Sequence, residues 1–337
     1  WMKFANSLKL KLAINLADVS PGKAQAHAEA AISGGVFTSA KDNALFPYQT
    51  STPNTNELYV DLVQSGRNDF VPANTLINLM AEYQDPRMDY YFDDKISVEF
   101  PVKNGVKQND TMLVDFPVLL YYNDGTKSLA QPDSIYDPAA MDSLYGLVIP
   151  QADTALEPSY YLGGRYGYSN SYPNYSHIDA QIKAPDFPGV LMTYSEIQFY
   201  VAEVDARGWN AGQTSESAFN EAVTASIIYW GGTAKQASDY LTMHPYSSYA
   251  DWKEAIATQS YISLYTRGMV SYNQYRRLDL PVMNMAPNAE TPNAEVPTRF
   301  TYPINEQTLN AENYKAAAEA IGGDDMTNRL FWDTSAP

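Results

Sequence analysis

Residues 193–209 read TYSEIQFYVAEVDARGW, and this stretch decides the fold. Thr193 is a favourable N-cap residue, and Glu196 lies three positions later, as in a capping box. Behind them, apolar residues recur at helical spacing, namely Ile197, Val201 and Val204. Gly208 supplies a stop signal. The stretch therefore predicts one helix, in which Glu196 serves the cap and Glu203 is a solvated residue.

Helical periodicity continues on both sides of this stretch. On the C-terminal side it predicts helices at about 215–230, 249–265 and 269–277. On the N-terminal side it predicts an opening helix, a second helix between Ser20-Pro21 and Gly34-Gly35, and a short helix at about 73–83. Two helices of this length joined by a short turn form the repeating unit of a tetratricopeptide-type array. No clean repeat of about 34 residues is present, so a regular solenoid is not predicted.

The segment between the two helical blocks has a different composition. Prolines, glycines and aromatic residues replace the helical period, and the alternation over 96–100 predicts short strands. A loop-rich stretch of this length is uncommon in a compact protein unless it serves a function. The chain is predicted to be a single domain, 1–337. Within it, residues 1–83 and 190–277 are helical, 84–189 are loop-rich and 278–337 are irregular.

Composition excludes several classes of function. The chain has 39 acidic and 22 basic residues, and its formal charge of −17 disfavours binding to phosphate backbones and anionic membrane surfaces. The absence of cysteine excludes thiol catalysis and thiolate metal sites. No apolar run reaches the length of about 18 residues that a transmembrane helix needs. Binding to nucleic acid and spanning of a membrane are therefore not predicted.

Motifs for catalysis, phosphate binding and dinucleotide binding are missing from the sequence. The histidines, His27, His177 and His244, lie in different segments without metal-ligand spacing. Asp324-Asp325 follows two glycines and offers oxygen ligands for calcium, but it lacks the ligand spacing of an EF-hand. No cofactor and no metal site are predicted, and structural calcium stays an open alternative.

A glycoside hydrolase is the alternative from another class of function. Such an enzyme needs two carboxylates that face a cleft. Glu196 and Glu203 lie seven residues apart and share a helix face, but a cap and a solvated position explain them without catalysis. The protein is therefore predicted not to be an enzyme.

Tyrosine is the informative residue type. The chain has 27 tyrosines, and six of them lie within residues 160–175, among glycines and asparagines. A tyrosine ring offers a flat apolar face with a hydroxyl at its edge, at little cost in side-chain entropy. Sugar rings have an apolar C–H face and equatorial hydroxyls, so such a loop suits them. The alternative is that these tyrosines pack the loop onto the helical body. The predicted ligand-binding residues are Tyr161, Arg165, Tyr166, Tyr168, Asn170 and Tyr172.

Several segments together resemble the SusD/RagB-like family of outer-membrane lipoproteins. Each motif is short, but the matches run in order over nearly the whole chain, which makes the resemblance specific. The matching segments are Trp1–Ala13, Gly34–Phe37 with Asp42–Ala44, Asp85–Met88, Leu191–Phe199 with Ala202-Glu203 and Arg207–Trp209, Tyr275–Arg277, Tyr302-Pro303, and Gly322–Asp325 through Phe331–Asp333.

The resemblance implies a mainly α fold, in which tetratricopeptide-like helix pairs (an α-α superhelix) support a loop-rich ligand-binding face with a few short strands. It implies non-catalytic capture of a nutrient for delivery to a SusC-like TonB-dependent transporter on the surface of Bacteroidetes-type bacteria. Members capture oligosaccharides and some relatives favour peptides, so a peptide-binding helical adaptor stays open. The ligand-contacting residues of the family vary, and none is carried over by motif.

The start of the numbered sequence carries a separate expectation. Family members have a signal peptide and a lipid-modified cysteine at the mature N-terminus, and neither is seen here. No N-cap precedes Trp1. Trp1 is therefore predicted to lie within a helix, and the intact protein to extend N-terminally by at least one helical pair. The lipid anchor and part of the ligand site are expected on that part.

Overall fold

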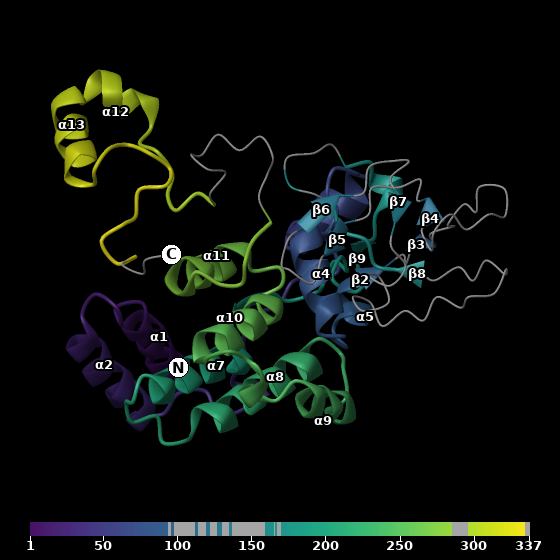
Figure 1. Cartoon of the computed structure of the whole chain (residues 1–337), viewed down its shortest axis with the longest axis horizontal. Helices are drawn as coiled ribbons and strands as arrows, with labels where there is room; N and C mark the ends of the chain where they lie inside the picture. Colours follow the sequence, from purple (N-terminus) through teal and green to yellow (C-terminus); the bar gives the residue numbers. More distant parts are fainter. Residues whose placement is uncertain are drawn as a thin grey trace. The chain divides into compact units, whose positions relative to one another are not determined.

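The computed structural model describes residues 1–93, 161–164, 166, 170–284 and 296–333, and the backbone of the short strands between 96 and 160. The chain divides into two compact units. We call residues 1–66, 165–169 and 181–337 the helical unit, and residues 67–164 and 170–180 the loop unit. Figure 1 labels the elements of both units.

Helices make up most of the helical unit. In chain order they are α1 (Met2–Ile14), α2 (Pro21–Ser33), η1 (Ala40–Asp42), α3 (Glu57–Tyr59), η2 (Val60–Gln64), α7 (Tyr194–Ala206), α8 (Ser215–Tyr229), α9 (Ala234–Met243), η5 (Tyr246–Ser248), α10 (Trp252–Ser263), α11 (Gly268–Leu278), α12 (Ile304–Leu309) and α13 (Ala311–Ala320). Two short strands, β1 (Ala44–Phe46) and β10 (Gly189–Met192), pair antiparallel beside them.

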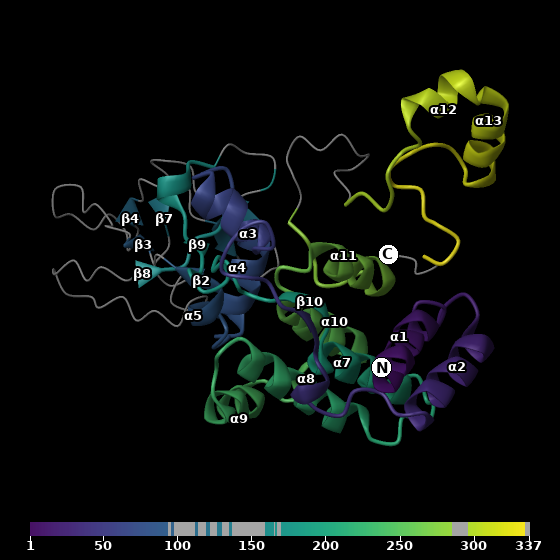
Figure 2. The ribbon, with the colours of Figure 1, turned by 180° about the vertical axis from the view of Figure 1, so that it is seen from behind.

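α7 is the central helix of this unit. It packs against α1, α8 and α10, and Figure 2 shows it between these helices. Ten of its 13 residues are buried. Consecutive helices also pack in pairs, α1 with α2, α7 with α8 and α10 with α11. These pairs confirm the predicted mainly α fold with few short strands.

The caps of two helices differ from their predictions. The Thr193 side chain accepts a hydrogen bond from the backbone N–H of Glu196, as predicted. The Glu196 carboxylate, which the sequence predicts to complete a capping box, instead forms ion pairs with basic side chains of other elements. A capping box with both bonds is present at α9. There Thr233 and Gln236 bond reciprocally, and this helix is missing from the sequence prediction. α9 buries only Ala237 and Tyr240, so its apolar period is weak.

The opening helix is present where the sequence predicts it. α1 begins at Met2, and the Ala5 N–H donates to the carbonyl oxygen of Trp1, the first residue of the numbered sequence, at 2.9 Å. The buried face of α1 holds Leu10, Ala13 and Ile14. These residues are three and four positions apart, or adjacent, so they share the face that packs against α2 and α7.

Part of the C-terminal region is helical, whereas the sequence predicts residues 278–337 to be irregular. α13 has the sequence AENYKAAAEA, and none of its residues is buried. A search for an apolar stripe therefore misses it. Alanine has the highest intrinsic helix propensity, which stabilises a helix even where packing contributes little.

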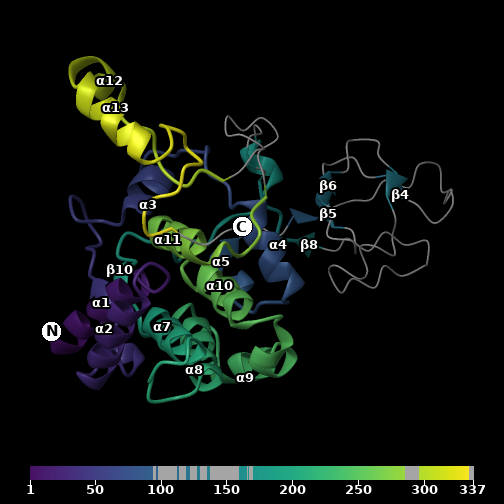
Figure 3. The ribbon, with the colours of Figure 1, turned by 60° about the vertical axis from the view of Figure 1, so that its left-hand side comes forward.

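The loop unit contains two helices, α4 (Asn74–Glu82) and α5 (Met88–Tyr91). Its strands pair antiparallel in twos: β2 (Phe92–Asp93) with β9 (His177–Ile178), β3 (Ile96–Ser97) with β8 (Ser159–Tyr160), β4 (Met112–Leu113) with β7 (Ile135–Tyr136), and β5 (Leu119–Tyr121) with β6 (Lys127–Leu129). Figure 3 shows α4 and α5 with the strands that follow them. The predicted single domain is not tested by this division into units and stays a prediction.

The described helices include none that combines the length and the apolarity needed to cross a membrane.

Candidate functional site

The tyrosine loop, residues 160–175, has both of its ends fixed within the loop unit. The Leu162 N–H donates to Ser176 Oγ at 2.9 Å, and the Ser176 N–H donates to the Leu162 carbonyl oxygen at 3.0 Å. The next residues along the chain form β9, which pairs with β2. The two ends of the loop therefore lie side by side.

Two glycines bring the loop close to the start of α4. The Gly164 N–H donates to the Pro72 carbonyl oxygen, and the Asn74 N–H donates to the Gly164 carbonyl oxygen, each at 2.8 Å. A Cβ atom on Gly163 would lie 2.5 Å from the Asn74 Cα. These glycines therefore permit a close approach between two backbones.

Replacing Gly163 by alanine is expected to lower the free energy of unfolding by about 1–3 kcal/mol, because the added methyl group meets backbone atoms that cannot rotate away. Urea unfolding of the variant measures this change. The control is Gly22→Ala in α2, where an added Cβ has no atom within 4 Å, so the stability should stay the same or rise slightly. Equal effects at both positions would contradict the close approach.

Tyr161 is committed to the body of the loop unit. Its ring packs on Phe92, with ring centroids 5.8 Å apart, and its hydroxyl donates to Asp89 Oδ1 at 2.8 Å. Partial burial, the hydrogen bond to Asp89 and the nearby carboxylates of Asp93 and Asp179 hold the pKa of the Tyr161 phenol well above its usual range. The hydroxyl therefore stays protonated.

Tyr172 forms an aromatic pair with His177. The two rings are nearly parallel, at 16°, and their centroids are 3.7 Å apart. The His177 Nε2 also lies 3.0 Å from the Tyr172 carbonyl oxygen. A carbonyl oxygen only accepts, so Nε2 carries the hydrogen. This bond fixes the imidazole against the tyrosine ring.

The pairing of β2 with β9 places a carboxylate next to this aromatic pair. Asp93 lies opposite His177 in the antiparallel register, and directly opposite residues point to the same face of a sheet. The Asp93 Oδ2 accepts a hydrogen bond from the Ala180 N–H at 2.7 Å, which holds the carboxylate in place. The loop unit thus joins aromatic faces, a ring N–H and carboxylates from three separate segments. Of these groups, the sequence prediction names only tyrosines.

The other predicted ligand residues have different surroundings. Tyr166 is 40% exposed, and burial together with the interaction with Tyr166, to which the Tyr261 hydroxyl donates, holds the pKa of Tyr261 above its usual range within the helical unit. Asn170 lies beside Gly164, because a Cβ atom on that glycine would be 2.9 Å from the Asn170 Cγ. Arg165 and Tyr168 lie outside the described residues.

The carboxylate of Glu196 serves the helical scaffold. Its side chain is 2% exposed and forms ion pairs with Lys11 at 2.9 Å and Arg267 at 2.6 Å. Tyr200 also donates to the same carboxylate. Arg267 donates in addition to the Leu191 carbonyl oxygen. Both carboxylate oxygens are therefore engaged, in a position that a substrate does not reach.

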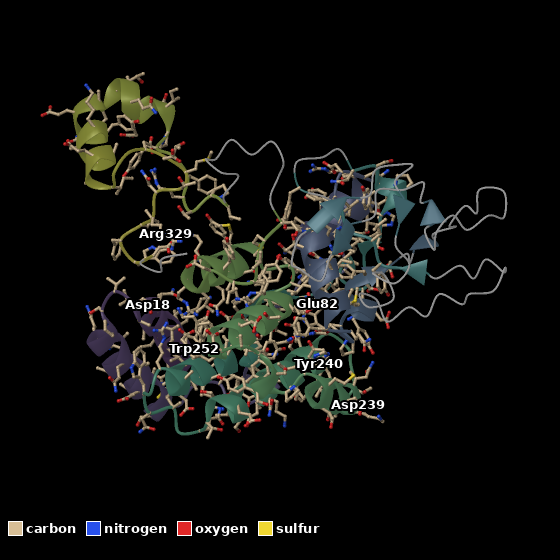
Figure 4. The ribbon with its side chains drawn as sticks, viewed as in Figure 1. Asp18, Glu82, Asp239, Tyr240, Trp252 and Arg329 are labelled. Carbon is tan, nitrogen blue, oxygen red and sulfur yellow. The ribbon has the colours of Figure 1, made fainter. Side chains whose placement is uncertain are left out.

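Glu203 is fully buried, so its prediction as a solvated helix residue is wrong. Its Oε1 accepts from Arg277 and, at 2.8 Å, from the Arg207 Nε. Arg207 extends the network to Asp18, at 2.8 Å, which Figure 4 labels. The Arg277 Nη2 donates to Gln274 at 2.9 Å. The partners lie up to 74 positions away in the chain, so helical periodicity alone does not reveal them.

Asp324 and Asp325 have structural partners. Asp324 accepts from Arg299 at 2.7 Å and from the Tyr302 N–H, and Asp325 accepts from Thr327. Over the residues that the structure describes, no three His, Asp or Glu side chains are grouped so as to hold a metal ion.

A family profile whose description is "starch-binding associating with outer membrane", named SusD-like, matches residues 1–110 and 140–303. No curated protein sequence matches the chain.

Solved structures of similar fold come from the same class of proteins. A chitin-binding protein is 24% identical over 99% of this chain and 65% of its own, with a TM-score of 0.71. A SusD homologue from Bacteroides thetaiotaomicron is 23% identical over 100% and 66%, with a TM-score of 0.70. A chitin-binding SusD homologue from Flavobacterium johnsoniae is 21% identical over 100% and 64%, with a TM-score of 0.68. The chain thus spans about 65% of the length of these relatives.

Proposed function

The chain belongs to the SusD-like family of starch-binding proteins associated with the outer membrane, and on that premise we propose that it captures an oligosaccharide without catalysing a reaction. The captured glycan passes to a SusC-like TonB-dependent transporter. The protein acts at the cell surface, where a lipid anchor holds it to the outer membrane.

One observation carries this proposal, namely the stacked pair of Tyr172 and His177 beside the Asp93 carboxylate. Sugar hydroxyls bind weakly through hydrogen bonds alone, because water competes for each bond at little net gain. An aromatic face adds apolar contact without a deep pocket, and a neighbouring carboxylate accepts from two sugar hydroxyls at once.

We assign the contacts within the tyrosine loop as follows. The rings of Tyr161, Tyr166, Tyr168 and Tyr172 supply stacking faces, while Arg165 and Asn170 supply polar contacts.

The two carboxylates considered for a hydrolase have structural roles. A retaining or inverting hydrolase needs two carboxyl groups that reach the glycosidic bond. Glu196 and Glu203 are both buried and each is paired with two basic side chains. Their role in the fold is sufficient to explain their positions.

Replacing Tyr172 by alanine is expected to weaken glycan binding about tenfold or more, because losing one aromatic anchor typically costs more than 1 kcal/mol. Calorimetry with the oligosaccharide that binds best in a screen measures the affinity. Tyr172→Phe is the matched control, since it keeps the ring face and should bind within about threefold of the wild type.

Three outcomes would contradict the proposal, in calorimetry with oligosaccharides and peptides and in an analysis of the sugars after incubation. A Tyr172→Ala variant that melts like the wild type and binds glycan normally would place the contact elsewhere. Preferential binding of peptides over oligosaccharides would favour the peptide adaptor. Release of shortened sugars during incubation would show a hydrolase.

A further inference from the structure

The C-terminal part of the helical unit forms a hairpin that closes on itself. The Thr298 N–H donates to the Met326 carbonyl oxygen at 2.7 Å, and the buried side chains of Arg299 and Asp324 pair at 2.7 Å. Between these closing contacts lie α12 and α13 (Figure 1), which pack against each other. We call residues 298–328 the arm.

Both ends of the arm are fixed to α11. Just before the arm, the Pro297 carbonyl oxygen accepts a hydrogen bond from the Tyr272 hydroxyl. Just after it, Asp333 pairs with Arg276 at 3.3 Å, and the guanidinium of Arg276 lies over the Trp332 ring. These contacts hold the base of the arm, whereas none of the residues of α12 and α13 is buried.

The arm exposes large apolar side chains and has an excess of acidic ones. Phe300, Ile304 and Leu309 are each between 73% and 85% exposed. The arm has five acidic and two basic residues. Of the acidic ones, Glu312 and Glu319 form no ion pair with any residue that the structure describes. Exposed apolar side chains with polar ones around them are typical of a surface that contacts another protein.

A second exposed apolar surface lies on α1. One face of this helix packs against α2 and α7, whereas the opposite face bears Trp1, Leu8 and Leu12 at helical spacing, each at least 39% exposed. A helix that is apolar on all sides is normally buried. Beside its first turn, Leu45 and Leu191 line a hollow of about 520 Å³ together with Trp1. We call these five apolar residues the α1 surface.

The α1 surface lies in a basic part of the chain. Residues 1–48 have five lysines and three acidic residues, although the whole chain has a formal charge of −17. Lys9 follows Leu8 on α1 and forms no ion pair within the described residues. The α1 surface and the arm are therefore opposite in charge, and both offer apolar side chains for contact.

We propose that the arm of one copy binds the α1 surface of a second copy. Opposite charges attract the two surfaces, and an apolar side chain of the arm fills the hollow beside α1. In a single chain both surfaces are exposed at the same time, and the arm is fixed to α11, so the contact joins two chains. Each copy keeps one free surface of each kind, so association continues into a ring or a filament.

Sedimentation velocity of the whole chain tests the association. Between about 1 and 100 µM, where moderate protein contacts form, we expect the mean mass to rise above the 37.5 kDa of one chain. Raising the salt concentration from about 0.05 to 0.5 M should weaken association by about threefold or more, because opposite charges are screened. A chain that stays monomeric throughout would overturn the inference, and so would an association that salt does not weaken.

Variants of each surface identify the contact. Ile304→Ser with Leu309→Ser changes the arm, and Leu8→Ser with Leu12→Ser changes the α1 surface. All four side chains are exposed, so both double variants should melt like the wild type. Each should be monomeric alone. A mixture of the two should form a dimer and nothing larger, since one intact arm and one intact α1 surface remain.

Exposed apolar side chains elsewhere provide the control. Ile228→Ser with Met243→Ser removes side chains of α8 and α9 that are 47% and 52% exposed, and this variant should associate like the wild type. Loss of association in the α1 variant alone would indicate a contact between two α1 surfaces. Equal losses in all three variants would indicate non-specific apolar association. Either result, like a mixture that stays monomeric, would overturn the pairing of the arm with the α1 surface.

Discussion

Replacing Glu203 by alanine is expected to lower the free energy of unfolding by about 3–5 kcal/mol, the range for breaking a buried ion pair on one side. The carboxylate is 0% exposed, and Arg277, which it binds, is only 3% exposed. Without Glu203, the guanidinium of Arg277 stays buried and loses the carboxylate that balances its charge, while its hydrogen bond to the uncharged Gln274 is kept. Urea unfolding followed by helical circular dichroism measures the loss.

Glu203 also pairs with Arg207, four residues further along α7, and an exposed ion pair of this spacing provides the control. Lys235 and Asp239 are also four residues apart on a helix, but their side chains are 82% and 56% exposed. Asp239→Ala should therefore change stability by less than about 1 kcal/mol. If burial is the cause, the double variant Glu203→Met with Arg277→Met should recover most of the loss, because an apolar pair needs no charge compensation. A double variant as unstable as Glu203→Ala would contradict that cause.

The helices of the centre could be predicted because their signals are local. Thr193 and Glu196 are three residues apart, and the apolar residues of α7 follow at helical spacing. The start of α2 at Pro21 and its C-cap at Gly34 likewise depend on adjacent residues. Such signals fix where a helix begins and ends, but they do not give the element that it packs against.

The roles of the buried charges depend on residues that are distant in the sequence. The sequence predicts a cap role for Glu196 because Thr193 lies three residues before it. Its ion-pair partner Lys11 is 185 positions away in the chain. Glu203 and Arg277 are 74 positions apart. Only the tertiary packing of α7 against other helices brings these groups together. Local sequence therefore favours a solvated position for Glu203, and this prediction is wrong because the residue is buried.

The candidate site shows the same limit. A cluster of tyrosines is visible in the sequence, and this cluster predicts Tyr172 as a ligand residue, which stays a prediction. Its partner His177 has no metal or catalytic spacing, and Asp93 joins it only through the two-residue register of β2 with β9. A pair of strands this short carries too little periodicity to predict its partner.

Replacing Arg87 by alanine is expected to have an effect of similar size in the loop unit. The side chains of Asp85 and Arg87 are both 0% exposed. The Asp85 Oδ1 accepts from the backbone N–H and the Nε of Arg87 at 2.9 and 2.8 Å, and the Oδ2 accepts from Nη2. Loss of the guanidinium leaves a buried carboxylate with its main partner removed, at a cost of about 3–5 kcal/mol.

The position of Arg87 also predicts an effect on binding, because Arg87 directly precedes α5, which leads into β2. These elements carry Asp89, which accepts from Tyr161, and Asp93, which is opposite His177. Arg87→Ala is therefore expected to reduce the hydrogen-exchange protection of residues 88–93 and to weaken glycan binding together with it. Arg87→Lys keeps the charge but not the planar two-point geometry, so it should recover only part of the stability. Full stability in the lysine variant would mean that charge alone suffices, and full protection of residues 88–93 in the alanine variant would separate this ion pair from the candidate site.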